Sequence, residues 1–359
     1  MRVRGFEMRA VREPLVLAER ELLPPVAGEA VVEVLGCGIC HTDLGFLDDG
    51  VPVRHALPLV LGHEIVGRVV DAGPDARALI GSDVIVPAVM ACGRCALCTS
   101  GKAEICRAQV FPGCDVHGGF ATHVVVPAHA LCRVPAERPA GLELAHLAVV
   151  ADALSTAYAA VKKSGLGAGS FAVVVGTGGV GGFAAQIARA RGAKVLALDV
   201  DEKRLARLEA EGCVDWTLSV RGLDAKAVRK AVRERAHAAG AGDTCWHIFE
   251  TSGSAPGQET AFSLLTHGAV LSVVGYHAGS VNLRLSNLMA FAARAEGTWG
   301  CPAELFPECL ALVLDGRVKV APFVEVHPMS ELPSVLDRMR RHEITARPVM
   351  IPDRAMAID

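Results

Sequence analysis

The stretch Phe171-Ala-Val-Val-Val-Gly176-Thr-Gly178-Gly179-Val180-Gly181 decides the architecture of the central part of the chain. Its first five residues form a continuous apolar run, which is typical of a strand buried on both faces of a parallel sheet. The glycines follow the pattern G-x-G-x-x-G and precede a helix that we expect over residues 180–191. Such glycines allow a tight turn and bring the backbone close to a pyrophosphate at the helix N-terminus. The stretch therefore predicts a dinucleotide site.

An acidic residue supports this interpretation. Asp199 ends the next expected strand, residues 194–199, where the fingerprint requires a partner for the adenosine ribose. Its carboxylate accepts hydrogen bonds from the ribose hydroxyls and repels a 2′-phosphate, so NAD is favoured over NADP. The alternative is a glycine-rich turn that binds no nucleotide.

The surrounding sequence predicts the fold class. Expected helices and strands alternate as far as residue 275, which indicates an α/β doubly wound parallel sheet. The first 150 or so residues contain short β-branched runs separated by Gly and Pro, which indicates a mostly antiparallel β domain. We expect a first domain over residues 1–153, a nucleotide domain over 154–303, and a return of 304–359 to the first domain.

Four cysteines form a second motif. Cys92, Cys95, Cys98 and Cys106 have the spacing C-x2-C-x2-C-x7-C on a polar loop. Four thiolates at this spacing can surround one zinc ion tetrahedrally, and such a closed site leaves no position for a substrate. We therefore expect a structural zinc ion here; the alternative is a group of unrelated buried cysteines.

Composition excludes several classes of function. The net charge is −3 and no long basic block is present, so nucleic-acid binding has no electrostatic support. No apolar run reaches the roughly 18 residues of a membrane helix, and the first residues lack the apolar stretch of a signal peptide. Twelve cysteines without an export signal favour a reducing cytoplasm.

A second metal site is expected in the first domain. Cys40 lies in Gly38-Ile-Cys-His-Thr-Asp43, and His63 lies in Gly62-His-Glu64. A catalytic zinc ion takes three protein ligands and keeps one open position, and a thiolate and an imidazole suit it. Taken alone, either residue would more often be structural.

The motifs G-I-C-H-T-D, G-H-E, the four-cysteine loop and G-T-G-G-V-G occur in the order found in the zinc-dependent medium-chain alcohol dehydrogenases, which the whole chain resembles. The resemblance implies a GroES-like catalytic domain, a Rossmann domain for NAD, and two zinc ions per chain. It implies that Cys40 and His63 bind the catalytic zinc ion, with Asp152 as third ligand and Glu64 as a neighbour and occasional ligand. The alternative for Asp152 is a helix N-cap.

The resemblance also assigns the proton path. Thr42 matches the residue that bonds the substrate oxygen and passes its proton outward, and Asp43 matches the carboxylate that orients the ligand histidine. Many relatives carry a histidine where this chain has Gly45, so the proton must leave through water, the cofactor ribose or His41. Thr42 can alternatively serve only as a turn cap.

Further coenzyme contacts follow from the same resemblance. Arg204 matches a basic residue near the adenosine ribose, and Arg347 matches a late arginine near the pyrophosphate. Val274 and Gly275 end the strand that runs beside the nicotinamide. Both arginines can instead be surface residues.

The resemblance implies that a secondary alcohol is oxidised and its hydride passed to NAD. Ala88 stands where bulkier residues often narrow the pocket, so a cyclic or branched alcohol fits. The resemblance of the chain as a whole, and no single motif, implies a coenzyme A thioester of a ring alcohol. Homodimers or homotetramers are expected from the family. Two alternatives are a zinc-free reductase of activated C=C bonds and a non-catalytic zinc module that binds a partner.

Overall fold

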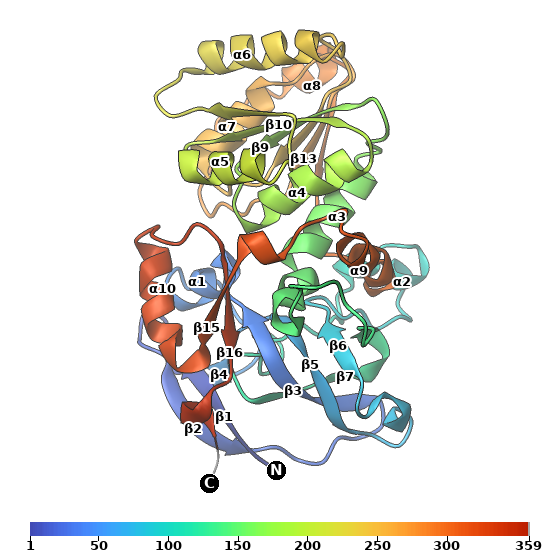
Figure 1. Ribbon diagram of the computed structural model, residues 1–359, viewed down its shortest axis with the longest axis vertical. Coiled ribbons are helices and arrows are strands. Elements are labelled where there is room, and N and C mark those ends of the chain that lie inside the picture. Colours follow the sequence, from blue (N-terminus) through green and yellow to red (C-terminus); the bar gives the residue numbers. More distant parts are fainter. Residues whose placement is uncertain (358–359) are drawn as a thin grey trace. The chain divides into compact units, whose positions relative to one another are not determined.

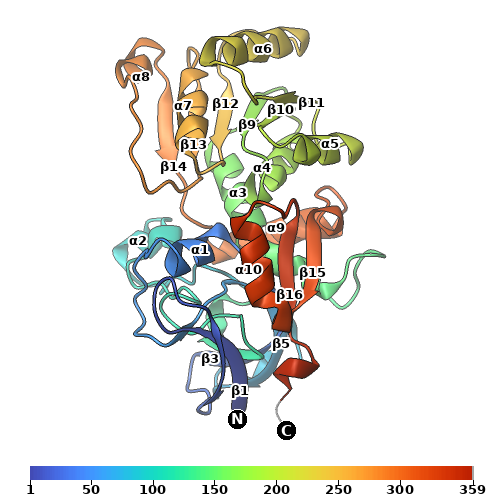
Figure 2. The ribbon, with the colours of Figure 1, turned by 90° about the vertical axis from the view of Figure 1, so that its left-hand side faces the viewer.

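The computed structural model describes residues 1–357, which form two compact units (Figures 1 and 2). One unit contains residues 1–155 and 300–316 together with the chain from residue 320 onward. The other contains residues 156–299 and 317–319. The second unit is therefore a long insertion in the sequence of the first.

The inserted unit is built on a six-stranded parallel sheet with the order β11-β10-β9-β12-β13-β14. Its central strand β9 is buried along its whole length, as its continuous apolar sequence predicts. The strands are β9 (Phe171–Val175), β10 (Lys194–Asp199), β11 (Trp216–Ser219), β12 (His247–Glu250), β13 (Val270–Val273) and β14 (Arg294–Gly297).

The strand order reverses between β9 and β12. Because crossovers between parallel strands are right-handed, the helices on the two sides of this point cover opposite faces of the sheet. Ligands bind such sheets at the carboxyl ends of the strands beside the reversal. The helices are α4 (Gly179–Ala190), α5 (Glu202–Ala210), α6 (Ala225–Ala238), α7 (Ala255–Ser263) and α8 (Ser286–Ala290).

The first unit contains a seven-stranded sheet and a three-stranded sheet. The larger has the order β15-β16-β3-β5-β6-β8, with β7 paired to β3, and the smaller has the order β2-β1-β4. All pairs are antiparallel except β15 with β16. The strands are β1 (Arg2–Met8), β2 (Val16–Glu21), β3 (Glu29–Gly38), β4 (Leu59–Val60), β5 (Glu64–Ala72), β6 (Asp83–Val86), β7 (His123–Pro127), β8 (Cys132–Arg133), β15 (Val324–Pro328) and β16 (Arg347–Ile351).

Helices of the first unit are few and short. They are α1 (His41–Leu47), α2 (Ala96–Thr99), α9 (Phe306–Leu314) and α10 (Leu332–Arg340), and α3 (Ala153–Lys163) runs from the first unit into the second. The 3-10 helices are η1 (Arg77–Leu79), η2 (Ala103–Ile105), η3 (Ala128–Ala130), η4 (Leu144–Ala151), η5 (Ala303–Leu305), η6 (Ala321–Phe323), η7 (Met329–Glu331) and η8 (Arg354–Met356).

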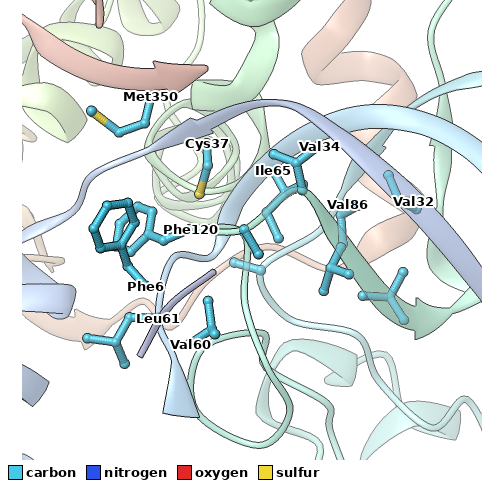
Figure 3. Close-up of a cluster of buried hydrophobic side chains, with 14 of the residues drawn as sticks. Phe6, Val32, Val34, Cys37, Val60, Leu61, Ile65, Val86, Phe120 and Met350 are labelled. Carbon is cyan, nitrogen blue, oxygen red and sulfur yellow. The ribbon is translucent and has the colours of Figure 1, made fainter. Parts of the chain in front are cut away.

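The core of the first unit positions the start of β5. Cys37 and Phe120 belong to one buried cluster of aliphatic and aromatic side chains (Figure 3). They press against Gly62, where a Cβ would lie 2.8 Å from each, and Gly62 has a φ of +92°. Only glycine fits both constraints. The packing therefore fixes the backbone immediately before His63.

The expected fold class, a doubly wound parallel sheet combined with a mostly β domain, is confirmed. Strands β11 and β14 were not predicted. β11 is only half-buried, and β14 has the sequence Arg-Ala-Glu-Gly at the sheet edge, so neither carries a clear apolar pattern.

Within residues 1–357, no single helix is both long and apolar enough to cross a bilayer. The bent pair η4 and α3 reaches the necessary length and apolar composition only when the two helices are taken together.

Replacing Phe120 with Ala should strongly destabilise the first unit. Phe120 is fully buried, and a Phe→Ala cavity in a core costs about 3–5 kcal/mol of unfolding free energy. Urea unfolding of the purified protein measures the change. Leu23→Ala, at a side chain that is 78 % exposed, serves as the control and should shift the transition little. A similar shift for both variants would contradict the role of Phe120.

Candidate active site

Cys40 is placed by the turn between β3 and α1. It is the N-cap residue of α1, and its backbone N–H donates to Asp43 Oδ2 at 2.9 Å. The same carboxylate accepts from the N–H of Gly62 through Oδ1 at 3.1 Å. Asp43 therefore ties the segment carrying Cys40 to the segment carrying His63.

His63 is buried and lies between two carboxylates. Its Nδ1 is 3.5 Å from Asp43 Oδ1, and its Nε2 is 3.4 Å from Asp152 Oδ2. Burial is the largest single effect and lowers the pKa of His63, but Asp43, Asp152 and Cys40 together outweigh it and raise the pKa well above its usual value. Neither ring nitrogen makes a hydrogen bond to any described residue. The ring thus has one nitrogen facing an orienting carboxylate and the other facing a potential metal position.

Asp152 lies at the junction of η4 and α3, and its carboxylate faces His63 and Cys40. The first N–H of α3, on Ala153, is bonded by Glu64 Oε1 at 3.1 Å. The carboxylate of Asp152 thus lies beside the two other expected metal ligands.

The spacing of these three residues fits zinc. Their ligand atoms all lie within 4.8 Å of one another. Tetrahedral zinc with ordinary bond lengths separates a nitrogen and an oxygen ligand by about 3.4 Å, and a sulfur and an oxygen ligand by about 3.6 Å. The observed separations are 3.4 Å from His63 Nε2 to Asp152 and 3.8 Å from Cys40 Sγ to Asp152. Three protein ligands leave one tetrahedral position for a substrate oxygen.

Glu64, expected beside the metal, pairs with Arg347. Arg347 Nε donates to Glu64 Oε2 at 3.0 Å, and both side chains are buried. Burial raises the pKa of Glu64, and Arg347 opposes this shift. The same carboxylate fills the space beside Gly38, where a Cβ would lie 2.0 Å from Oε2. A contact of Glu64 with zinc, or of Arg347 with a pyrophosphate, stays a prediction.

The expected proton path begins beside the metal ligands. Thr42 Oγ1 is 3.6 Å from Cys40 Sγ, whereas the side chain of His41 is exposed. A Cβ on Gly45 would meet only Val51, at 3.5 Å. The roles of Thr42 and His41 in proton transfer stay predictions. Ala88 is buried, and its N–H donates to Ala151 O, next to Asp152.

Phe111 also belongs to this site, although the sequence did not indicate it. Its ring centroid is 5.0 Å from that of His63. A lone phenylalanine in a loop has no spacing that marks it as a neighbour of a metal ligand.

The four cysteines of the loop converge. Neighbouring sulfurs are 3.4 to 4.0 Å apart, and tetrahedral zinc would hold them at about 3.8 Å. Backbone N–H groups of Arg94 and Cys95 lower the pKa of Cys92 to about 6, whereas burial and neighbouring sulfurs raise that of Cys98 to about 12. Four thiolates can coexist here only around a cation, so the donor set fits zinc.

The dinucleotide loop has the expected shape. Gly176 has a φ of +88°, and α4 begins at Gly179 with Gly178 as N-cap residue and Val180 and Gly181 in its first turn. Asp199 Oδ2 accepts from the backbone N–H of Thr177 at 2.6 Å and from its hydroxyl at 2.8 Å. The acidic residue therefore holds the loop in place at the carboxyl end of the sheet.

Two further expected contacts lie near this loop. A Cβ on Gly178 would be 3.8 Å from Arg204, whose Nε is 3.6 Å from Asp201 Oδ2. Val274 and Gly275 follow β13, and their N–H groups donate to the backbone oxygen of Glu250. The coenzyme roles of Arg204, Val274 and Gly275 stay predictions.

Comparison with known proteins shows what the chain is similar to. The family model described as "Alcohol dehydrogenase GroES-like domain" matches residues 26–136, and that described as "Zinc-binding dehydrogenase" matches residues 179–315. An alcohol dehydrogenase of Geobacillus stearothermophilus is 29 % identical over 95 % of this chain and 97 % of its own length.

Solved structures similar to this chain are also alcohol dehydrogenases. The alcohol dehydrogenase of Aeropyrum pernix has a TM-score of 0.86 at 28 % identity, covering 97 % of this chain and 100 % of its own. A cobalt- and zinc-bound thermostable alcohol dehydrogenase from Pyrobaculum aerophilum has a TM-score of 0.83, covering 98 % of this chain and 100 % of its own. Its identity of 24 % shows a common fold only.

The chain belongs to the zinc-dependent medium-chain alcohol dehydrogenase family. It is an oxidoreductase with a GroES-like domain and a Rossmann domain, and its cofactors are zinc and a nicotinamide dinucleotide.

Replacing Cys98 with Ser should remove the structural zinc ion of this dehydrogenase. Loss of one thiolate opens the closed site, and structural zinc contributes directly to folding stability. We expect the zinc content, measured by atomic emission, to fall by one ion per chain and the melting temperature to fall with it. Cys245→Ser, at an exposed cysteine outside both clusters, is the control. Full zinc content in Cys98→Ser would contradict the assignment.

Proposed function

We propose that this enzyme oxidises a secondary alcohol to a ketone and transfers the hydride to NAD. The convergence of Cys40, His63 and Asp152 carries the proposal, because three ligands with one open position distinguish a catalytic zinc site from a closed one. The glycine loop and Asp199 supply the coenzyme site.

NAD is proposed over NADP because of Asp199. Asp199 is 7 % exposed and ends β10, where the adenosine ribose binds in this fold. A 2′-phosphate placed there would face a fixed negative charge.

Each residue of the proposed active site has a separate role in the oxidation of the alcohol. Zinc, when bound, acts as a Lewis acid that lowers the pKa of the alcohol oxygen. Thr42 accepts the hydroxyl proton, and Asp43 holds the His63 ring so that Nε2 faces the reaction position. NAD, when bound at the glycine loop, would supply the hydride acceptor, and the protein supplies position and charge. The proton then leaves through water, the ribose or His41.

The substrate we propose is 6-hydroxycyclohex-1-ene-1-carbonyl-CoA, which would give the 6-oxo product in anaerobic aromatic (benzoyl-CoA) degradation. Two arguments support this substrate. The sequence as a whole resembles 6-hydroxycyclohex-1-ene-1-carbonyl-CoA dehydrogenase, and the small side chain of Ala88 leaves room for a cyclic alcohol. A free aryl, cyclic or polyol alcohol is the alternative. A zinc-free enoyl reductase is disfavoured, because such an enzyme needs neither Cys40 nor His63.

Assembly and location are also proposals. We propose a homodimer or homotetramer, as in the family. We also propose a cytoplasmic location, because none of the twelve cysteines, all of which lie in residues 1–357, forms a disulfide.

NADH formation at 340 nm with a panel of alcohols tests the function. The panel contains the cyclohexenyl-CoA alcohol, a plain cyclic secondary alcohol, benzyl alcohol and a polyol. Preference for the thioester would support the CoA substrate, and turnover of only the free alcohols would discard it. Cys40→Ser should abolish turnover, and full activity in that folded variant would refute the zinc mechanism.

Replacing Thr42 with Val should lower kcat, because the isosteric side chain cannot accept the substrate proton. General acid–base groups typically contribute about 10²–10⁴-fold. Thr42→Ser keeps a hydroxyl and should retain most of the activity, with unchanged zinc content in both variants. Equal kcat values for the Val and Ser variants would show that Thr42 only caps the turn.

A further inference from the structure

The buried carboxylate of Glu250 has no place in the function described so far. Glu250 ends β12, at the reversal of strand order, and is 1 % exposed. Its Oε1 accepts from the N–H of Ser252 at 2.8 Å, the hydroxyl of Ser252 at 2.6 Å and the N–H of Gly253 at 3.2 Å. One carboxylate oxygen thus organises the whole turn over residues 251–254, which we call the β12 turn.

The β12 turn reaches the glycine loop directly. The hydroxyl of Thr251 donates to the backbone oxygen of Gly176 at 2.6 Å and to that of Val175 at 3.0 Å. Ser252 presses against Gly176, where a Cβ would lie 2.6 Å from the Ser252 Cα. The conformation of the glycine loop is therefore set by the β12 turn on one side and by Asp199 on the other.

The same turn also supports the segment after β13. A Cβ on Gly275 would lie 2.2 Å from the N of Gly253 and 2.9 Å from Glu250 Oε2. Gly253 itself has a φ of +61°, and a Cβ there would lie 2.7 Å from Tyr276 O. Backbone meets backbone here without intervening side chains. A shift of the β12 turn must therefore move Gly176 and Gly275 together.

We infer that Glu250 is a positioning residue for the coenzyme: by fixing the β12 turn, it sets the glycine loop and the segment at Gly275 relative to each other. This inference rests on the proposed dinucleotide site. Glu250 contacts neither substrate nor coenzyme in this role. It acts through Thr251, Ser252 and Gly253.

The role needs an acceptor at Oε1 rather than a negative charge. Burial raises the pKa of Glu250, and the donors of Ser252, Gly253 and Gly275 oppose this shift. Gln keeps the accepting oxygen and the length of the side chain, whereas Ala leaves buried N–H groups without a partner. The two substitutions therefore separate the hydrogen-bonding role from simple occupation of space.

Hydrogen–deuterium exchange of the coenzyme-free protein is the first test. In Glu250→Ala, we expect faster exchange in peptides covering residues 172–182 and 250–258 than in wild type. Glu250→Gln should resemble wild type. Unchanged exchange in the Ala variant would overturn the inference.

NADH binding, followed by fluorescence titration, is the second test. Loss of several buried hydrogen bonds should weaken binding in Glu250→Ala by about tenfold or more, with near-wild-type affinity in Glu250→Gln. Ile248→Ala is the matched control, because it creates a cavity in the same buried strand without touching the turn. It should lower the melting temperature yet retain NADH affinity.

Equal weakening in Ile248→Ala and Glu250→Ala would reduce Glu250 to a general stabilising role and overturn the inference. If wild type bound no NADH, the proposed coenzyme would be wrong, and the exchange measurement would still decide whether Glu250 holds the glycine loop.

Discussion

The catalytic half of the molecule depends on one buried ion pair, Glu64 with Arg347. Glu64 is the neighbour of His63, and its carboxylate also accepts from the N–H of Ala153, the neighbour of Asp152. Arg347 begins β16, which pairs with the end of β3 just before Cys40. The pair therefore joins the three segments that carry the metal ligands. Removing one partner of such a pair typically costs about 3–5 kcal/mol, because the other charge is left buried.

Much of this organisation could be predicted from the sequence, because the motifs are local. The glycine pattern, Asp199 and the four cysteines lie in short stretches whose spacing has a direct geometric meaning. Cys40 and His63 were assigned as ligands by the family resemblance of their motifs. The residues that hold these motifs in place could not be identified from the sequence. Arg347 lies far along the chain from Glu64, and the pairing depends on β16 joining the sheet beside β3. Glu250 likewise ends β12 without any sequence spacing that marks it.

The coenzyme half is organised by two acidic side chains on the strands that flank β9. Asp199 at the end of β10 and Glu250 at the end of β12 each accept hydrogen bonds from a loop or turn at the same edge of the sheet. Their oxygens are directed at N–H and hydroxyl donors. The negative charges are thereby partly satisfied within the protein, next to a loop whose expected ligand is itself an anion.

The division of the first unit into sequence-distant segments has a consequence for biosynthesis. The insertion over residues 156–299 holds all six strands of its sheet, so nearly the whole nucleotide unit has left the ribosome before β15 and β16 are made. The zinc ligands emerge earlier still, yet Arg347 emerges after all of them. The first unit is therefore the last to complete its fold during translation. The buried ion pair beside its metal ligands can form only after β16, which carries Arg347, has been synthesised.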